Sequence, residues 1–149
     1  MSVEWNVSEI PGGLEVRLSG KIDEKFDIAP VVSAARPAKR VSVRLSGLRA
    51  ISSLGMRTFE ALVGALRDGP RELSLIDVSP ALATQLTLIP NLCAGARVES
   101  AWLPFACTSC GAEVSATVPW KPSGHIEAAP TCECGSKMEL DGLPEQYLP

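Results

Sequence analysis

The sequence predicts an α/β protein in which a mixed β-sheet carries helices on one face and is followed by a small cysteine-rich domain. Four short segments alternate apolar and polar residues, as half-buried strands do. Segments between them repeat apolar residues at helical spacing. Strands that alternate with helices in this way are expected of a sheet with crossover connections. Four of the five cysteines lie in the last third of the chain. We therefore expect a first domain over residues 1–103 and a second over residues 104–149.

The strands follow from the alternation. Pro11, Gly12 and Gly13 separate the first two alternating segments and predict an antiparallel hairpin. A last strand is expected near residues 98–103. Strands covered on both faces would be apolar throughout, so the alternation predicts helices on one face only. The residues expected to face the core are Val3, Trp5, Val7, Leu14, Val16, Leu18, Val41, Val43, Leu45, Leu73 and Leu75.

Three helices are expected between the strands. The longest covers residues 53–68 and ends at Gly69 and Pro70. A shorter helix covers residues 28–35, before Pro37. Ser79 and Pro80 open the third, with the serine as its cap. The apolar residues expected to line the longest helix are Phe59, Leu62, Val63 and Leu66. Those expected to line the helix after Pro80 are Leu82, Leu86 and Leu88 or Ile89.

Composition narrows the possible functions. The 14 basic residues stand against 17 acidic ones, for a net charge of −3, which gives no general attraction to nucleic acid or to anionic membranes. The longest uncharged run, residues 78–96, contains two prolines and a glycine and does not predict a membrane span. The first residues show no basic leader before an apolar stretch. A cytoplasmic protein is expected.

The cysteines form two close pairs, Cys107 with Cys110 and Cys132 with Cys134, each followed by glycine. Two such pairs predict a tetrahedral four-thiolate Zn²⁺ site, and four protein ligands make the zinc structural. Two disulfides in an exported protein are the alternative. His125 is a substitute ligand if the closer C-x-C spacing prevents Cys132 from reaching the metal. The fifth cysteine, Cys93, lies among apolar residues and is expected to pack in a core.

Two segments resemble the STAS domain family, which includes the anti-sigma factor antagonists. Residues 43–56, VRLSGLRAISSLGM, are similar to the family's strand and the hydrophobic-Asp-Ser-Ser-Gly-hydrophobic turn that opens a helix. Residues 18–23, LSGKID, are similar to its Leu-x-Gly-x-Leu/Ile-Asp segment. The resemblance covers roughly residues 3–103, and the last third looks like an attached zinc ribbon. The sequence gives no interpretation for residues 137–149.

The resemblance implies a site at the start of the longest helix. Family members bind a serine kinase, often an anti-sigma factor, and a phosphorylated serine breaks that complex. By position, Ser53 matches this serine, Gly55 matches the family glycine and Asp23 matches the aspartate of the earlier segment. Two positions differ from the family pattern: Ser52 stands where the family has aspartate, and Leu54 stands where it has a second serine. A phosphate at Ser53 would meet the free amides of a helix N-terminus. Ser52 and Ser53 are equally ordinary cap residues, so a partner-binding domain without phosphorylation is the alternative.

The resemblance thus implies a bacterial regulatory protein of signal transduction that binds an anti-sigma factor or serine kinase. A scaffold, or a domain that binds a nucleotide or lipid, is the second interpretation. An enzyme is not expected, because the chain has one histidine, no glycine-rich phosphate loop, and carboxylates such as Asp77 that we interpret as scattered surface charges. Nucleic-acid binding by the ribbon ranks lower, since residues 101–149 hold two lysines against six acidic residues. Trp120 is interpreted as an exposed residue that either stacks on a base or contacts a protein.

Overall fold

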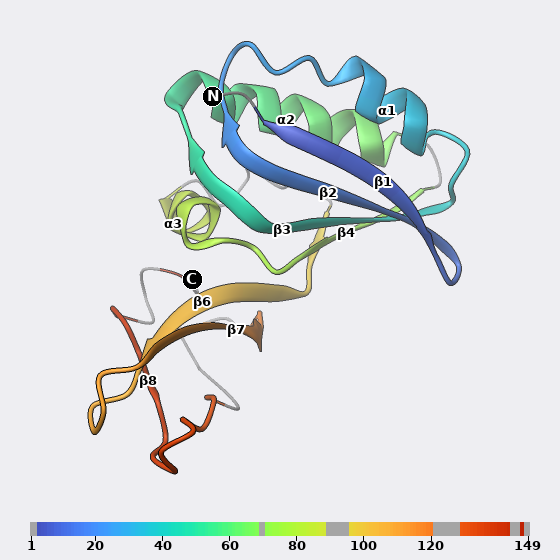
Figure 1. Ribbon diagram of the computed structural model, residues 1–149. Coiled ribbons are helices and arrows are strands. Elements are labelled where there is room, and N and C mark those ends of the chain that lie inside the picture. Colours follow the sequence, from blue (N-terminus) through green and yellow to red (C-terminus); the bar gives the residue numbers. More distant parts are fainter. Residues whose placement is uncertain (1–2, 69–70, 89–95, 121–128, 144–146, 148–149) are drawn as a thin grey trace.

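The computed structural model describes residues 3–68, 71–88, 96–120, 129–143 and 147, the side chains of residues 87 and 88 excepted. Two sheets lie one after the other along the chain (Figure 1). The elements are β1 (Glu4–Ile10), β2 (Gly13–Ile22), α1 (Ala29–Ala35), β3 (Arg40–Ile51), α2 (Ser53–Arg67), β4 (Glu72–Ile76), α3 (Pro80–Leu88), β5 (Arg97–Val98), β6 (Ser100–Ala106), β7 (Glu113–Pro119) and β8 (Glu139–Leu140).

The first sheet is mixed and has the order β1-β2-β3-β4-β5. β1 and β2 form the expected antiparallel hairpin, and the other neighbours are parallel. Helices α1 and α2 cover one face of this sheet (Figure 1), so the predicted fold class is confirmed. The second sheet, β7-β6-β8, is antiparallel.

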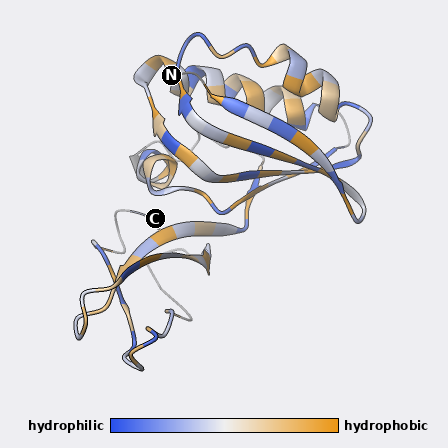
Figure 2. Ribbon diagram, in the orientation of Figure 1, coloured by the Kyte–Doolittle hydropathy of each residue, from blue (hydrophilic) through white to orange (hydrophobic). Residues whose placement is uncertain are grey.

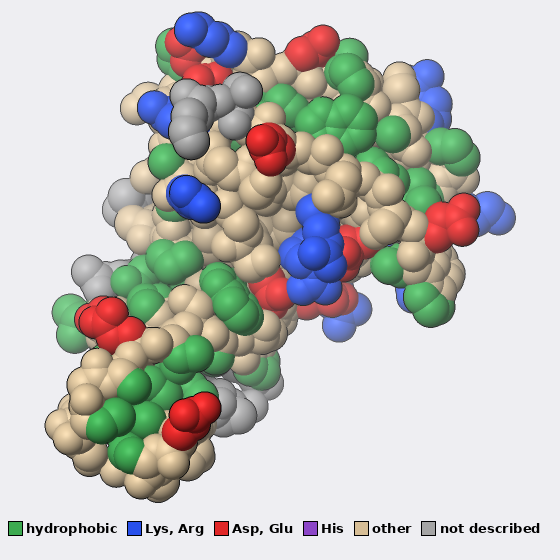
Figure 3. Space-filling model, viewed as in Figure 1, with side chains coloured by type: hydrophobic (Ala, Val, Ile, Leu, Met, Phe, Trp, Pro, Cys, Tyr) green, Lys and Arg blue, Asp and Glu red, His purple; other side chains and the backbone are tan. Residues whose placement is uncertain are grey.

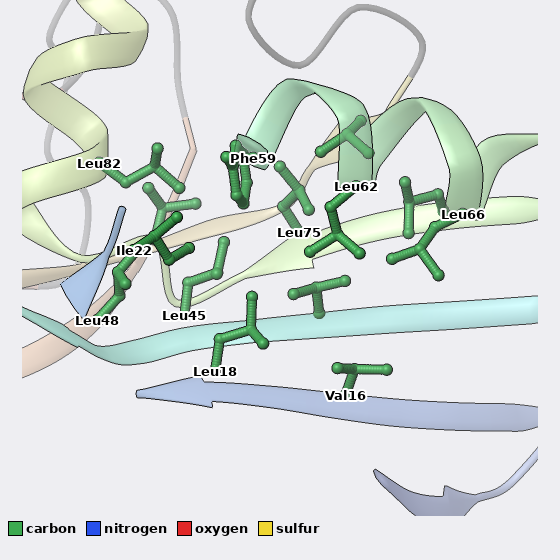
Figure 4. Packing of buried hydrophobic residues seen from close by; sticks show 14 of the residues in the cluster. Val16, Leu18, Ile22, Leu45, Leu48, Phe59, Leu62, Leu66, Leu75 and Leu82 are labelled. Atoms are coloured by element: carbon green, nitrogen blue, oxygen red, sulfur yellow. The ribbon is translucent and has the colours of Figure 1, made fainter. Parts of the chain in front are cut away.

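The core of the first sheet is aliphatic and lies between the strands and the helices. Alternate residues of β2, β3 and β4 point toward α2, and Leu82 of α3 joins the same cluster (Figure 4). The alternation of hydrophobic and hydrophilic residues along these strands is visible in Figure 2. The fully buried side chains include Val16, Leu18, Leu45, Phe59, Leu62, Leu66 and Leu75.

The predicted helices are confirmed, with Ser79 at the cap of α3 as expected, but the expected burial of Trp5 is wrong. Trp5 is 38% exposed, because β1 is the edge strand of its sheet. Ser79 caps α3 through its backbone only: its carbonyl accepts from Ala83 at 2.8 Å, while its buried hydroxyl has no hydrogen-bond partner among the described residues. Leu82 and Leu86 are buried as predicted. The side chain of Leu88, and Ile89, lie outside the described residues.

The expected last strand is divided between the two sheets. β5 pairs in parallel with β4, whereas β6 pairs with β7 and β8. Backbone hydrogen bonds continue between the first sheet and the start of β6: Val78 donates to Ser100 at 3.0 Å and Trp102 donates to Val78 at 2.8 Å. Residues 97–106 thus belong to both sheets, and the division expected after residue 103 lies inside β6.

An ion-pair network lies on the sheet face that α1 and α2 leave open. Arg44 donates to Glu15 at 2.9 Å and 3.1 Å and also to Asp77. Arg17 binds the other oxygen of Glu15 at 2.9 Å. Glu15 and Asp77 are each only 6% exposed, so the interpretation of Asp77 as surface charge is wrong. Figure 3 shows acidic and basic side chains gathered where the two sheets meet.

The same network reaches the second sheet through Asp77, whose backbone has a φ of 50°. The Thr117 hydroxyl of β7 donates to the Asp77 carboxylate at 2.8 Å. The Ser100 hydroxyl accepts from the backbone N–H of Asp77 at 2.8 Å. Trp120 is half-buried and packs against both hydrophobic clusters, rather than standing exposed as predicted. The junction between the sheets is therefore made of strand pairing, a buried carboxylate and an indole ring.

Glu15 makes this network sensitive to pH. Burial alone would raise the pKa of Glu15, but hydrogen bonds and charges from Arg44 and Arg17 outweigh it and leave this pKa below its usual 4.5. A carboxyl whose pKa is lowered by folding stabilises the fold above its usual pKa, and this contribution is lost as the pH falls through the lowered value. We expect the free energy of unfolding to fall less steeply below pH 4.5 in Glu15→Gln than in the wild type.

Urea titrations at a series of pH values measure this difference. Glu72→Gln is the matched control, because Glu72 pairs with Arg40 at 3.2 Å but its side chain is 71% exposed. Exposed pairs contribute little, so the control should keep the wild-type slope. If the free energy of unfolding fell equally steeply with pH in wild type and in Glu15→Gln, the stabilising role given to ionised Glu15 would be wrong.

Gly55 fixes the start of α2 against the end of β2. A Cβ atom at this position would lie 2.1 Å from the carbonyl oxygen of Ile22. Gly64, on the same helix, has no atom within 4 Å of such a Cβ and is exposed. We expect Gly55→Ala to lower the free energy of unfolding by about 1–3 kcal/mol. Gly64→Ala should raise it by up to about 1 kcal/mol through helix propensity. Thermal and urea unfolding measure both; similar effects of the two substitutions would contradict this close contact.

Candidate functional site

Four cysteine sulfurs meet at the far end of the second sheet. All lie within 4.8 Å of one another, with Cys107 and Cys134 at 3.6 Å and Cys110 and Cys132 at 3.4 Å. Four thiolates bound tetrahedrally at about 2.3 Å stand roughly 3.8 Å apart. The cluster is therefore of the right size to hold one metal ion, and both cysteines of the C-x-C pair reach it.

Each cysteine pair sits on a tight turn that glycine makes possible. The first turn joins β6 to β7, and Gly111 adopts a φ of 78° while donating to the Cys107 carbonyl at 2.9 Å. In the second turn Gly135 has a φ of 93° and donates to the Cys132 carbonyl at 2.9 Å. This left-handed conformation favours glycine. We call these two turns, residues 107–112 and 131–137, the first and second knuckles.

The knuckles are held together from two sides. On the outside, Ser136 of the second knuckle donates a hydrogen bond to Ser109 of the first at 2.9 Å. On the inside lies a small hydrophobic cluster. Its buried members are Ala101, Leu103, Phe105, Cys107, Val118, Cys132 and Met138. One cysteine of each pair is thus buried in this core, whereas Cys110 and Cys134 are exposed.

Hydrogen bonds to sulfur favour the thiolate form of Cys107 and Cys134 but not that of Cys132. Backbone N–H groups of Cys110 and Ser109 lower the pKa of Cys107. The backbone N–H and then the hydroxyl of Ser136 lower the pKa of Cys134 to about 6. For Cys132, a backbone N–H from Cys134 lowers the pKa, but the Cys110 thiol and burial outweigh it and raise this pKa to about 12. A divalent cation would replace these shared protons.

The four clustered cysteines are free thiols in this structure, and their sulfurs lie well beyond the roughly 2.05 Å of a disulfide bond. The arrangement therefore fits a metal better than the alternative of two disulfides. His125, the alternative ligand, and Cys93, the predicted core cysteine, both lie outside the described residues.

The second candidate position is the start of α2. Ser52 is the N-cap: its hydroxyl accepts from the backbone N–H of Gly55 at 2.9 Å, and its own N–H donates to Ile22 at 3.0 Å. Ser53 is the first residue of the helix and is exposed. Leu54 beside it is 51% exposed. Ser52 rather than Ser53 therefore caps the N-terminus of α2. The Ser53 side chain stays on the surface.

Asp23 lies in the loop that follows β2, against the same helix start. Its carboxylate accepts from the backbone N–H of Lys25 at 2.9 Å and so shapes this loop. A Cβ atom on Gly55 would lie 3.0 Å from the Cα of Asp23. The fold therefore brings together Asp23, Ser52, Ser53 and Gly55, the four positions that the STAS resemblance singles out.

No protein-family model matches this chain, and none of the curated proteins is significantly similar to it. Within the part of the chain that the structure describes, no helix is both long and apolar enough to cross a membrane.

We expect one metal ion per chain at the cysteine cluster. Cys107→Ser and Cys134→Ser each remove one of four thiolates and should reduce the bound metal well below one ion per chain. Amide exchange should speed up in the knuckles while α2 and β3 stay protected, because the first sheet has its own core. Elemental analysis of purified protein measures the metal.

Cys93→Ser is the control, because it removes a thiol that stands outside both pairs in the sequence. It should keep the wild-type metal content. One ion per chain in both Cys107→Ser and Cys134→Ser would show that the four-cysteine assignment is wrong.

Proposed function

We propose that this protein is a non-enzymatic cytoplasmic regulator of the STAS type, which binds a serine kinase or anti-sigma-type partner through the start of α2. The observation that carries the proposal is the exposed Ser53, next to the exposed Leu54, on a helix start that Ser52 and Gly55 hold in place. The apolar side chain of Leu54 would contact the partner, and phosphorylation of the neighbouring Ser53 hydroxyl would release it.

Phosphorylation of Ser53 would act through charge. The first amides of α2 and the positive end of the helix dipole favour a phosphate there, so the modified helix would stay folded. The phosphate adds up to about two negative charges beside Leu54. Burying this apolar contact against a partner then becomes unfavourable, which would release the partner.

We further propose that the metal is Zn²⁺ and that it is structural. Thiolate ligands in a tetrahedral set of four are typical of zinc, and they leave no open position for a substrate or a reactive water. The ion would join the first knuckle to the second and stabilise the small core beneath them.

The test of the partner surface is a pull-down from lysate of the source organism with four variants. Ser53→Glu mimics the added charge and should lose the partner that wild type holds, while Ser53→Ala should keep it. Leu54→Ser should weaken binding several-fold through lost apolar contact. Leu143→Ser is the matched control, because Leu143 is 63% exposed on the second domain.

A partner held equally by Ser53→Glu and wild type would leave an adaptor without a switch at Ser53. A partner lost equally from Leu54→Ser and Leu143→Ser would contradict the assignment to α2. If wild type retains no protein at all, the interaction proposal fails, and binding of a nucleotide or lipid becomes the leading interpretation.

A further inference from the structure

The hydrophobic core of the second sheet is open at the end where the knuckles lie. Phe105 and Val114 are directly opposite each other on β6 and β7, so their side chains share one face. Phe105 is 1% exposed, whereas Val114 is 44% exposed. Further along β7, Val118 is fully buried. This face of β7 is therefore buried at Val118 but exposed to solvent at Val114.

A groove lies beside the exposed face at Val114. It has a volume of about 630 Å³ and lies over the open face of the cysteine cluster, between β7 and the two knuckles. Cys110, Cys132 and Cys134 line it, and Val114 and Met138 are its largest apolar side chains. We call it the knuckle groove. Among the described residues β7 pairs with β6 alone, so no described strand binds the backbone groups on its other side.

The rim of the groove is acidic. Glu113 of β7 and Glu133 of the second knuckle both line it, and both are exposed. Glu139 and Asp141 lie nearby in sequence, and Lys137 is the sole basic residue among the described residues from 100 onward. A divalent ion on four thiolates adds a further net charge of about −2. This field attracts basic segments and repels phosphates.

We propose that the knuckle groove docks an extended basic segment of a protein partner. One aliphatic side chain of the segment enters the groove against Val114, and lysines or arginines on either side of it pair with Glu113 and Glu133. The surface is separate from the start of α2. It rests on the proposed zinc site, because the metal holds the second knuckle in the position that forms the groove.

The probe is a synthetic, end-blocked seven-residue peptide of alternating lysine and valine. It is titrated into the ¹⁵N-labelled, zinc-loaded full chain, and backbone resonances are followed by NMR. We expect saturable shifts confined to residues 110–114 and 131–138. Peptides in which glutamate replaces lysine, or serine replaces valine, should bind at least about five-fold more weakly.

Charge variants of the protein test the rim. The double variant Glu113→Gln/Glu133→Gln should bind the lysine–valine peptide at least about five-fold more weakly than wild type. Glu24→Gln/Glu60→Gln removes two exposed acids from the first domain and is the matched control, which should bind as wild type does. Ser53→Glu should also bind as wild type does, since its change lies on α2.

Several results would overturn the proposal: shifts scattered over the first sheet or α2, equal binding of the glutamate peptide, or unchanged affinity in Glu113→Gln/Glu133→Gln. Loss of peptide binding in Ser53→Glu would contradict a separate surface. The metal content of each variant is measured alongside. One ion per chain with no peptide binding rejects the groove and leaves the zinc site standing, whereas a chain without bound zinc rejects the zinc site itself.

Discussion

The arrangement of the two sheets depends on one strand segment, residues 97–106, which is hydrogen-bonded to the first sheet at its start and to the second sheet at its end. A linker between domains would leave their orientation free. Here the backbone bonds between Val78 and β6 remove that freedom. Asp77 reinforces them, because its buried carboxylate binds Arg44 on one side and Thr117 on the other. A buried carboxylate that loses one partner is costly, so the joint resists separation.

This rigid joint gives the two candidate surfaces a fixed relationship. The start of α2 lies at the top of Figure 1 and the knuckles lie at the bottom, with the joint between them. Each surface is set locally by a different device: the close contact of Gly55 with Ile22 places Ser53, and the four sulfurs place the rim of the knuckle groove. Partners bound at the two positions would therefore be held at a constant separation.

Local patterns predicted the elements of this structure well, and nonlocal contacts account for what they missed. Periodicity placed α2 and the starts of β1 to β4 to within a few residues, and paired cysteines predicted a cluster, because these signals lie in neighbouring residues. β7, β8 and the extension of β3 to Ile51 were not predicted. The burial of Asp77 could not be predicted, since it depends on Arg44 and Thr117, which are 33 and 40 residues away. Likewise, Trp5 alternates like a core residue, and only the position of β1 at the sheet edge leaves it exposed.

The two ends of the second sheet are stabilised by different means, and this decides what a metal bound at the cysteine cluster would control. The end at Ser100 is bound to the first sheet by backbone pairing and Asp77, and it needs no metal. The other end has only a small core, of which two buried members are themselves cysteines. Such a core is too small to hold two turns together unaided. Loss of an ion bound there should therefore open the knuckle groove while the joint and the Ser53 surface remain, so a bound metal would govern one candidate surface independently of the other.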